Sequence, residues 1–165
     1  MSALDAVQLD SMLRGLIVTT ELQNTGAREV WPLLFAAWLV ALVSSLAALF
    51  IGEVIGQVPC VLCWYQRAFM FPLAFILLVA SLQTDAAVWR YAMPLASAGW
   101  LFAAFHTLEY VGVIPKALEP CSLAGPSCSG AAMTILGGVP IPLLSFGAFT
   151  AIIALLTLVR RRLPA

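Results

Sequence analysis

Residues 31–51 read WPLLFAAWLVALVSSLAALFI and contain no charged side chain. A helix needs about 20 mostly apolar residues to cross the hydrocarbon core of a bilayer, and this run has that length and composition. Three more charge-free runs follow along the chain, at 68–82, 91–108 and 120–159. The sequence therefore predicts an all-α membrane protein, a bundle of four transmembrane helices.

The composition of the whole chain supports a membrane location. Of its 165 residues, 62% are hydrophobic and only 10% are charged, with a mean hydropathy of +1.01, whereas soluble domains carry about 25% charged residues. We expect a membrane domain of residues 31–162 with a short tail, 163–165. Residues 1–30 are expected to be a cytoplasmic extension that forms at most a weak amphipathic surface helix. The four expected spans are 31–51, 63–82, 91–113 and 142–159.

Basic residues in the connections predict how the bundle is oriented, because Lys and Arg concentrate on the cytoplasmic side of a membrane. With four spans both termini share one side. That side holds Arg14, Arg28, Arg90, Arg160, Arg161 and Arg162, whereas the other side holds only Lys116. We therefore expect cytoplasmic N and C termini and outer loops at 52–62 and 114–141. A net charge of zero without a basic patch gives no reason to expect a nucleic-acid partner.

All four cysteines lie on or beside the expected outer face, which in bacteria is oxidising and lets disulfides persist. Cys60 and Cys63 stand in the stretch PCVLCWYQR, residues 59–67, at a spacing that suits an exchangeable disulfide or a soft metal. Pro59 favours a helix that begins at this motif. Cys60, Cys63 and Arg67 would then share one helical face, and the helix N-terminus and the guanidinium would both stabilise a thiolate.

The other candidate residues lie further along the chain. Cys121 and Cys128 stand in an outer loop rich in Pro, Gly and Ser, where a turn can bring them within bonding distance. His106 is the only histidine. An ionisable group at membrane depth is a functional candidate, and the alternative is a polar side chain that simply bonds across to another helix. Glu109 lies three residues later, and we expect it to be a solvated residue near the outer interface.

Three functions are compatible with these residues. The favoured one is a membrane thiol–disulfide oxidoreductase, in which the two cysteine pairs pass electrons between a soluble thiol protein and an acceptor in the membrane. A metal-handling protein is less favoured, because cysteine gaps of two and then six residues are not typical of zinc sites. The third is a structural four-helix membrane subunit whose cysteines staple its outer loops.

The motif CVLCWYQR, the four-span layout and the cysteine pair in the second outer loop resemble the DsbB family of disulfide bond formation proteins, in its short-loop (BdbC-like) type. Relatives of vitamin K epoxide reductase share the plan but place the loop cysteines before the CxxC motif. The resemblance implies a quinone-dependent enzyme of the bacterial inner membrane, with its active cysteines facing the periplasm. Such an enzyme re-oxidises a DsbA-like thioredoxin-fold protein and passes the electrons to ubiquinone or menaquinone.

The resemblance also implies a role for each cysteine. Cys121 would form the mixed disulfide with the partner protein, and Cys128 would be its loop mate. Cys60 would relay between the two pairs, and Cys63 would meet the quinone ring. Whether Cys60 and Cys128 pair during turnover stays open.

By the same resemblance, Arg67 would polarise a quinone oxygen and His106 would lie near the same ring. The chain departs from the best-known branch of the family in two ways. The gap between its loop cysteines is much shorter, and Gln66 stands where that branch has an acid. The sequence leaves open which quinone is used, which dithiol protein is the partner and whether the chain acts alone.

Overall fold

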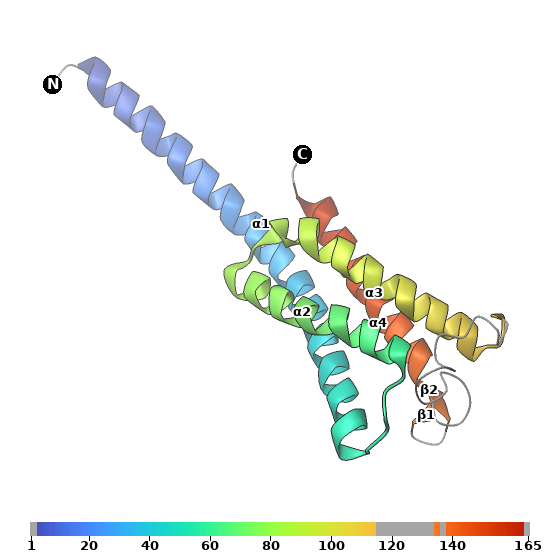
Figure 1. The fold of residues 1–165 in the computed structure, drawn as a ribbon. Coiled ribbons are helices and arrows are strands. Elements are labelled where there is room, and N and C mark those ends of the chain that lie inside the picture. The colour runs from blue at the N-terminus through green and yellow to red at the C-terminus, as the bar shows by residue number, and fades with distance from the viewer. Residues whose placement is uncertain (1–2, 115–133, 136–137, 164–165) are drawn as a thin grey trace.

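The structure is a computed structural model that describes residues 3–114, 134–135 and 138–163, and within residues 3–28 the side chains only of residues 8 and 12–15. Its four long helices are α1 (Ala3–Leu49), α2 (Val61–Gln83), α3 (Trp89–Tyr110) and α4 (Ile141–Arg162) (Figure 1). A π-helical turn, η1 (Phe50–Val54), continues α1, and a short 3₁₀ turn, η2 (Ala86–Val88), precedes α3. Two short strands, β1 (Thr134–Ile135) and β2 (Val139–Pro140), pair antiparallel before α4.

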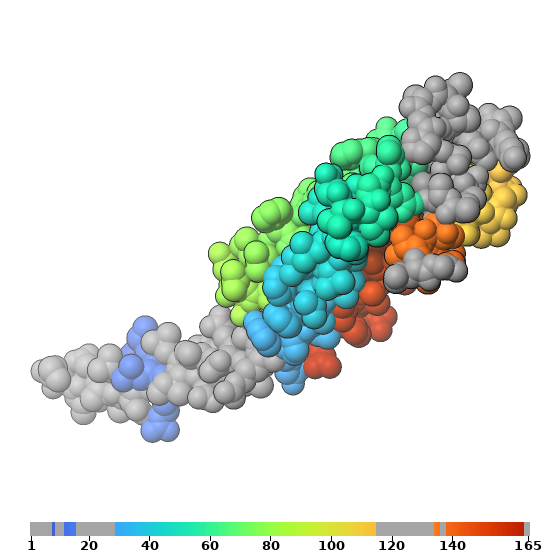
Figure 2. Space-filling view, turned by 90° about the horizontal axis from the view of Figure 1, so that it is seen from below, coloured from blue at the N-terminus to red at the C-terminus, as the bar shows by residue number. Residues whose placement is uncertain are grey.

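The four helices form a closed bundle. Helix α1 packs against α2 and α4, and α3 packs against the same two helices. Figure 2 shows one face of this arrangement, with the C-terminal end of α1 lying between α2 and α4. The N-terminal part of α1 extends beyond the other helices (Figure 1). The predicted helical class is therefore confirmed.

Three helical segments among the described residues are long and apolar enough to cross a membrane, namely Glu29–Val54, Val61–Gln83 and Ile141–Arg162. Helix α3 has 22 residues and contains His106 and Glu109, and it is not one of the three. The chain is thus a mostly helical protein with several membrane-spanning candidates. A fourth span at α3 and the side on which the termini lie stay predictions.

Two features differ from the expected layout. The helix that contains residues 31–51 begins at Ala3, so the backbone of the expected N-terminal extension continues directly into the first span, with Pro32 inside the helix. The pair β1 and β2 is a small departure from an all-α fold, and Gly138 between the strands has a φ of 145°, which favours glycine. The bounds of α2, α3 and α4 lie within three residues of the expected spans.

Small residues allow the helices to approach closely, as in other membrane bundles. The buried face of α3 is made of Ala92, Ala96, Gly99 and Ala103 along with His106 and Glu109. The facing side of α4 buries large side chains, among them Phe149, Ile152, Leu156 and Val159. Large side chains on one helix thus pack against small residues on the other, as the ring of Phe149 does against Gly99.

Contacts between distant residues bring three parts of the chain together at one end of the bundle. Arg162 at the end of α4 forms an ion pair with Glu29 of α1 at 3.1 Å. The guanidinium of Arg160 lies over the ring of Trp89, 4.8 Å from its centre, where α3 begins. The N-terminal end of the first candidate span and the C-terminal end of the last one therefore lie on the same side, as four spans require. The start of α2 with its cysteines lies at the opposite end (Figure 1).

The packing at Gly99 provides a test of the interface between α3 and α4. A Cβ atom at position 99 would overlap the ring of Phe149, which is fully buried. We expect Gly99→Ala to destabilise the bundle by about 1–3 kcal/mol, the usual cost of an overpacked core. Thermal unfolding in detergent would measure the loss.

Gly147→Ala is the matched control, because a Cβ atom at position 147 of α4 meets no heavy atom within 4 Å. It should leave the unfolding temperature unchanged or raise it slightly, since alanine favours a helix more than glycine does. Equal stability of Gly99→Ala and wild type would show that α3 and α4 do not pack in this way.

Candidate active site

Helix α2 begins at the CxxC motif, as the sequence predicts. Cys60 is the N-cap residue, with an extended backbone, and its sulfur accepts a hydrogen bond from the backbone N–H of Cys63 at 3.3 Å. This bond satisfies one of the N–H groups that the first turn of a helix leaves without a partner. The Cys60 S–H in turn donates to the Cys63 sulfur at 2.9 Å. The two thiols are therefore in contact at the start of a helix.

Cys60 is buried on the side of α2 that faces α3, with 1% of its surface exposed. Its sulfur lies 3.8 Å from Nε2 of His106, which is fully buried. The hydrogen bond with Cys63, followed by burial, raises the pKa of the Cys60 thiol above its usual value, whereas the contact with His106 acts in the opposite direction. Cys60 is thus held mainly as a thiol that donates to its neighbour.

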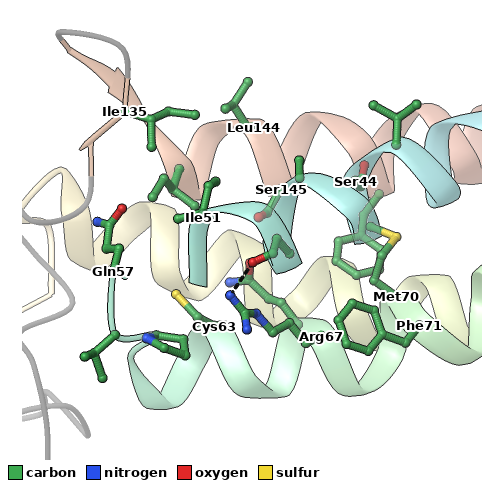
Figure 3. A pocket seen from close by; sticks show the side chains of 18 residues that line it. Ser44, Ile51, Gln57, Cys63, Arg67, Met70, Phe71, Ile135, Leu144 and Ser145 are labelled. Atoms are coloured by element: carbon green, nitrogen blue, oxygen red, sulfur yellow. Dashed lines mark hydrogen bonds between the residues drawn. The ribbon is translucent and has the colours of Figure 1, made fainter. Parts of the chain in front are cut away.

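Cys63 faces the other way, into a cavity of about 270 Å³ lined by the end of α1, η1, residues 57–59, α2, β1 and α4 (Figure 3). Most of the lining is apolar, with aliphatic side chains such as Ile51, Ile135 and Leu144 together with Met70 and Phe71. The sulfur of Cys63 and the guanidinium of Arg67 are exceptions, and both come from α2, one helical turn apart.

Arg67 is held on three sides. Its Nη2 donates to the backbone carbonyl of Ala48 at 2.7 Å, and its guanidinium lies 5.5 Å from the ring centre of Trp64. A Cβ atom at Gly52 in η1 would stand 3.2 Å and 3.3 Å from the two terminal nitrogens. The glycine therefore leaves space that the guanidinium occupies. The remaining N–H groups of Arg67 are near the cavity, where they can donate to an oxygen of a bound molecule.

Of the three residues that were expected to share a helical face, two line the cavity. Cys63 and Arg67 both line the cavity, but Cys60 does not. The reason is that an N-cap residue has a non-helical backbone, so its side chain does not follow the helical periodicity. His106 also lies outside the cavity lining, beside Cys60.

The prediction that Glu109 is a solvated residue is wrong, because only 2% of its surface is exposed. Its position three residues after His106 places it on the same face of α3, and that face is turned into the bundle. Cys121 and Cys128 lie outside the described residues, so their roles stay as the sequence predicts them.

Two residues of the site were missed at the level of the sequence. Gly52 cradles Arg67, and nothing in the sequence distinguishes it from other glycines near a helix end. Gln66 is 6% exposed and contacts His106 through its side-chain amide. A polar residue next to Arg67 in an apolar helix was visible in the sequence, but only the position of α3 gives it a partner.

Cys60, Cys63 and His106 could also be considered as metal ligands, since their donor atoms all lie within 4.8 Å of one another. The two sulfurs are 2.9 Å apart, whereas two thiolates bound to one tetrahedral zinc ion at about 2.3 Å each would lie about 3.8 Å apart. The two side chains would have to separate before they could bind such an ion. The observed geometry is better suited to thiol chemistry.

Comparisons with known proteins agree with this chemistry. A protein of Metapseudomonas resinovorans described as a probable disulfide formation protein is 58% identical over 132 residues, which cover 80% of this chain and 92% of that protein. Disulfide bond formation protein C of Bacillus subtilis is 38% identical over 127 residues, or 77% of this chain and 91% of that protein. No solved structure gives a significant match. The sequence model of the family "Disulfide bond formation protein DsbB" matches residues 27–159, and the chain therefore belongs to the DsbB family.

Proposed function

We propose that this chain is an enzyme that re-oxidises a DsbA-like thioredoxin-fold dithiol protein and passes the electrons to a membrane quinone. Electrons would enter through Cys121 and Cys128 and move to Cys60 and Cys63 by thiol–disulfide exchange. The family membership supports the disulfide chemistry. The observation that carries the quinone assignment is the apolar cavity that contains Cys63 and Arg67 side by side.

The residues of the cavity fit a quinone head group. Such a ring is flat and apolar, with carbonyl oxygens that only accept hydrogen bonds. The aliphatic and aromatic lining suits the ring, and Arg67 supplies N–H donors and a positive charge for one oxygen. Arg67 is already fixed by Ala48 and Trp64, so little side-chain entropy would be lost on binding.

The quinone would supply a two-electron acceptor that ends as a quinol. The residues of the protein would provide the other parts of the reaction. Cys63 brings a sulfur to the cavity wall as the electron donor, and the Cys60 S–H that donates to it stabilises negative charge there. Cys60 does not line the cavity, so it can close the disulfide with Cys63 without displacing a molecule bound next to Arg67.

The distribution of charge supports an orientation with the cysteines in the periplasm and both termini in the cytoplasm. Arg90, Arg160, Arg161 and Arg162 lie at the end of the bundle opposite the cysteines, and basic residues favour the cytoplasmic side. The oxidising outer compartment of a bacterium would then face Cys60 and Cys63. We accordingly propose the inner membrane as the location.

Replacing Cys63 tests the electron path. Each disulfide accepts two electrons, so the oxidised wild-type protein without quinone should oxidise two equivalents of a reduced thioredoxin-like partner, and Cys63→Ser should oxidise one. With a soluble quinone present, wild type should turn over and Cys63→Ser should not. Thiol counting and quinone absorbance under anaerobic conditions would give both values.

Retained binding of the quinone by Cys63→Ser would show that the loss comes from chemistry and not from a damaged fold. Continued quinone reduction by Cys63→Ser would contradict the assignment of Cys63. A wild-type protein with intact cysteines and bound quinone that reduces none of it would contradict the proposed enzyme.

A second prediction concerns the space that Gly52 leaves for the guanidinium of Arg67. Gly52→Val places methyl groups where the guanidinium lies, so we expect the KM for quinone to rise by about tenfold, corresponding to about 1.4 kcal/mol. The rate of exchange with the dithiol partner in the absence of quinone should not change. Steady-state and single-turnover kinetics separate the two effects.

Arg67→Ala provides the matched background. If Gly52 acts through Arg67, Gly52→Val should cause no further rise in KM when Arg67 is already absent, because the two effects are then not additive. An equal rise in both backgrounds would mean that position 52 acts on the cavity in another way.

A further inference from the structure

A buried polar pair, Gln66 and His106, connects α2 and α3 next to Cys60. Nε2 of Gln66 lies 3.0 Å from Nδ1 of His106, and Nε2 of His106 lies 3.8 Å from the Cys60 sulfur. His106 is fully buried and Gln66 is 6% exposed. Gln66 also touches the cavity, so it stands between the cavity and the histidine. Three groups from two helices thus form a row that ends at a reactive sulfur.

The hydrogen-bonding capacity of each group determines which atom donates and which atom accepts at each contact. The amide nitrogen of Gln66 can only donate, so Nδ1 of His106 must accept and carries no proton in this arrangement. A neutral imidazole then has its N–H at Nε2, the nitrogen that faces Cys60. The Cys60 S–H points to Cys63, and one lone pair of the Cys60 sulfur accepts from the Cys63 backbone N–H, which leaves the second lone pair available to accept.

We propose that Gln66 holds His106 in the Nε2–H tautomer, so that His106 donates a hydrogen bond to the Cys60 sulfur and stabilises its thiolate. This inference rests on the proposed function, in which Cys60 relays between the two cysteine pairs. It makes Gln66 and His106 positioning residues for the thiol exchange.

The hydrogen bond from His106 assists the step in which Cys60 is released. In the exchange between the pairs, one loop sulfur becomes bonded to Cys60, and the thiolate of the other loop cysteine attacks that loop sulfur. A loop disulfide forms, the bond to Cys60 breaks, and Cys60 leaves with the electron pair as a thiolate. An N–H group aimed at that sulfur stabilises the departing charge inside the bundle, where water cannot.

Glutamine at position 66 is decisive for this arrangement. The carboxylate of a glutamate at this position could only accept hydrogen bonds, so it would favour a proton on Nδ1 of His106. Cys60 would then face either the lone pair of Nε2 in a neutral ring or an imidazolium. Among the described residues, the other titratable groups near His106 are Cys63 in the first turn of α2, and Glu109 and Tyr110 about one turn further along α3, where Tyr110 packs against the cluster of Cys60 and Leu62. Arg67 is on the cavity side of α2.

The tautomer can be read directly, because His106 is the only histidine in the chain. We would label the reduced full-length protein with ¹⁵N-histidine, purify it in detergent with a tag that contains no histidine, and measure the two ring nitrogen shifts. Wild type should show the Nε2–H form, and Gln66→Glu should show a protonated Nδ1. Gln57→Glu, which changes another cavity residue that does not contact His106, should keep the wild-type pattern. A wild-type protein in the Nδ1–H form would overturn the proposal.

A thiol titration tests the effect on Cys60. In a Cys63→Ser, Cys121→Ser, Cys128→Ser background Cys60 is the only thiol, and ultraviolet absorbance follows thiolate formation with pH. Adding His106→Ala should move the midpoint up by about one pH unit, a tenfold change in thiolate at a given pH. His106→Gln, which has an amide N–H near the position of Nε2, should restore part of the shift. Unchanged midpoints in both variants would overturn the proposal.

Neither measurement needs quinone or partner protein. If the tautomer and the thiol titration differ from these expectations, the proposed enzyme is not contradicted. If the protein does not reduce quinone, the hydrogen-bonded row of Gln66, His106 and Cys60 is not contradicted.

Discussion

The backbone N–H of Cys63 donates to the sulfur of Cys60 across the first turn of α2, and the arrangement of the site depends on this bond. It makes Cys60 the N-cap of the helix and keeps the two sulfurs in contact. Because an N-cap residue leaves the helical path, the two side chains face different neighbours. Cys63 turns to the cavity and Cys60 turns to His106. One capping bond thus gives two adjacent thiols two separate environments.

The bundle provides those environments because α3 and α4 pack closely, whereas α1, α2 and α4 leave a cavity between them near the cysteines. Alanines and Gly99 on α3 bring the backbones close together, and large side chains of α4 fill the space that they leave. Near the start of α2, the wide turn η1 and the strand β1 take part in the wall in place of regular helix. The cavity lies where this change occurs, and Arg67 reaches across it to the carbonyl of Ala48.

Buried polar groups are concentrated where the chemistry is proposed. Apart from Ser45 and Ser81, the buried polar residues of the described core are Gln66, His106 and Glu109. Burying such groups in an apolar environment is costly unless they find hydrogen-bond partners. Gln66 and His106 satisfy each other between two helices. The proposed role accounts for this energetic cost, because the two residues would stabilise a sulfur whose charge changes during the reaction.

The sequence by itself determined the helical membrane character, the bounds of α2, α3 and α4 to within a few residues, the start of α2 at Cys60 and the family. These properties follow from runs of apolar residues and from local helix signals, which depend on neighbours in the chain. Only the tertiary structure decided that Gly52 cradles Arg67, that Glu109 is buried and that His106 faces Cys60. Those facts depend on how α1, α3 and α4 rotate against α2, and hydrophobic periodicity specifies that rotation poorly when helices are apolar on every side.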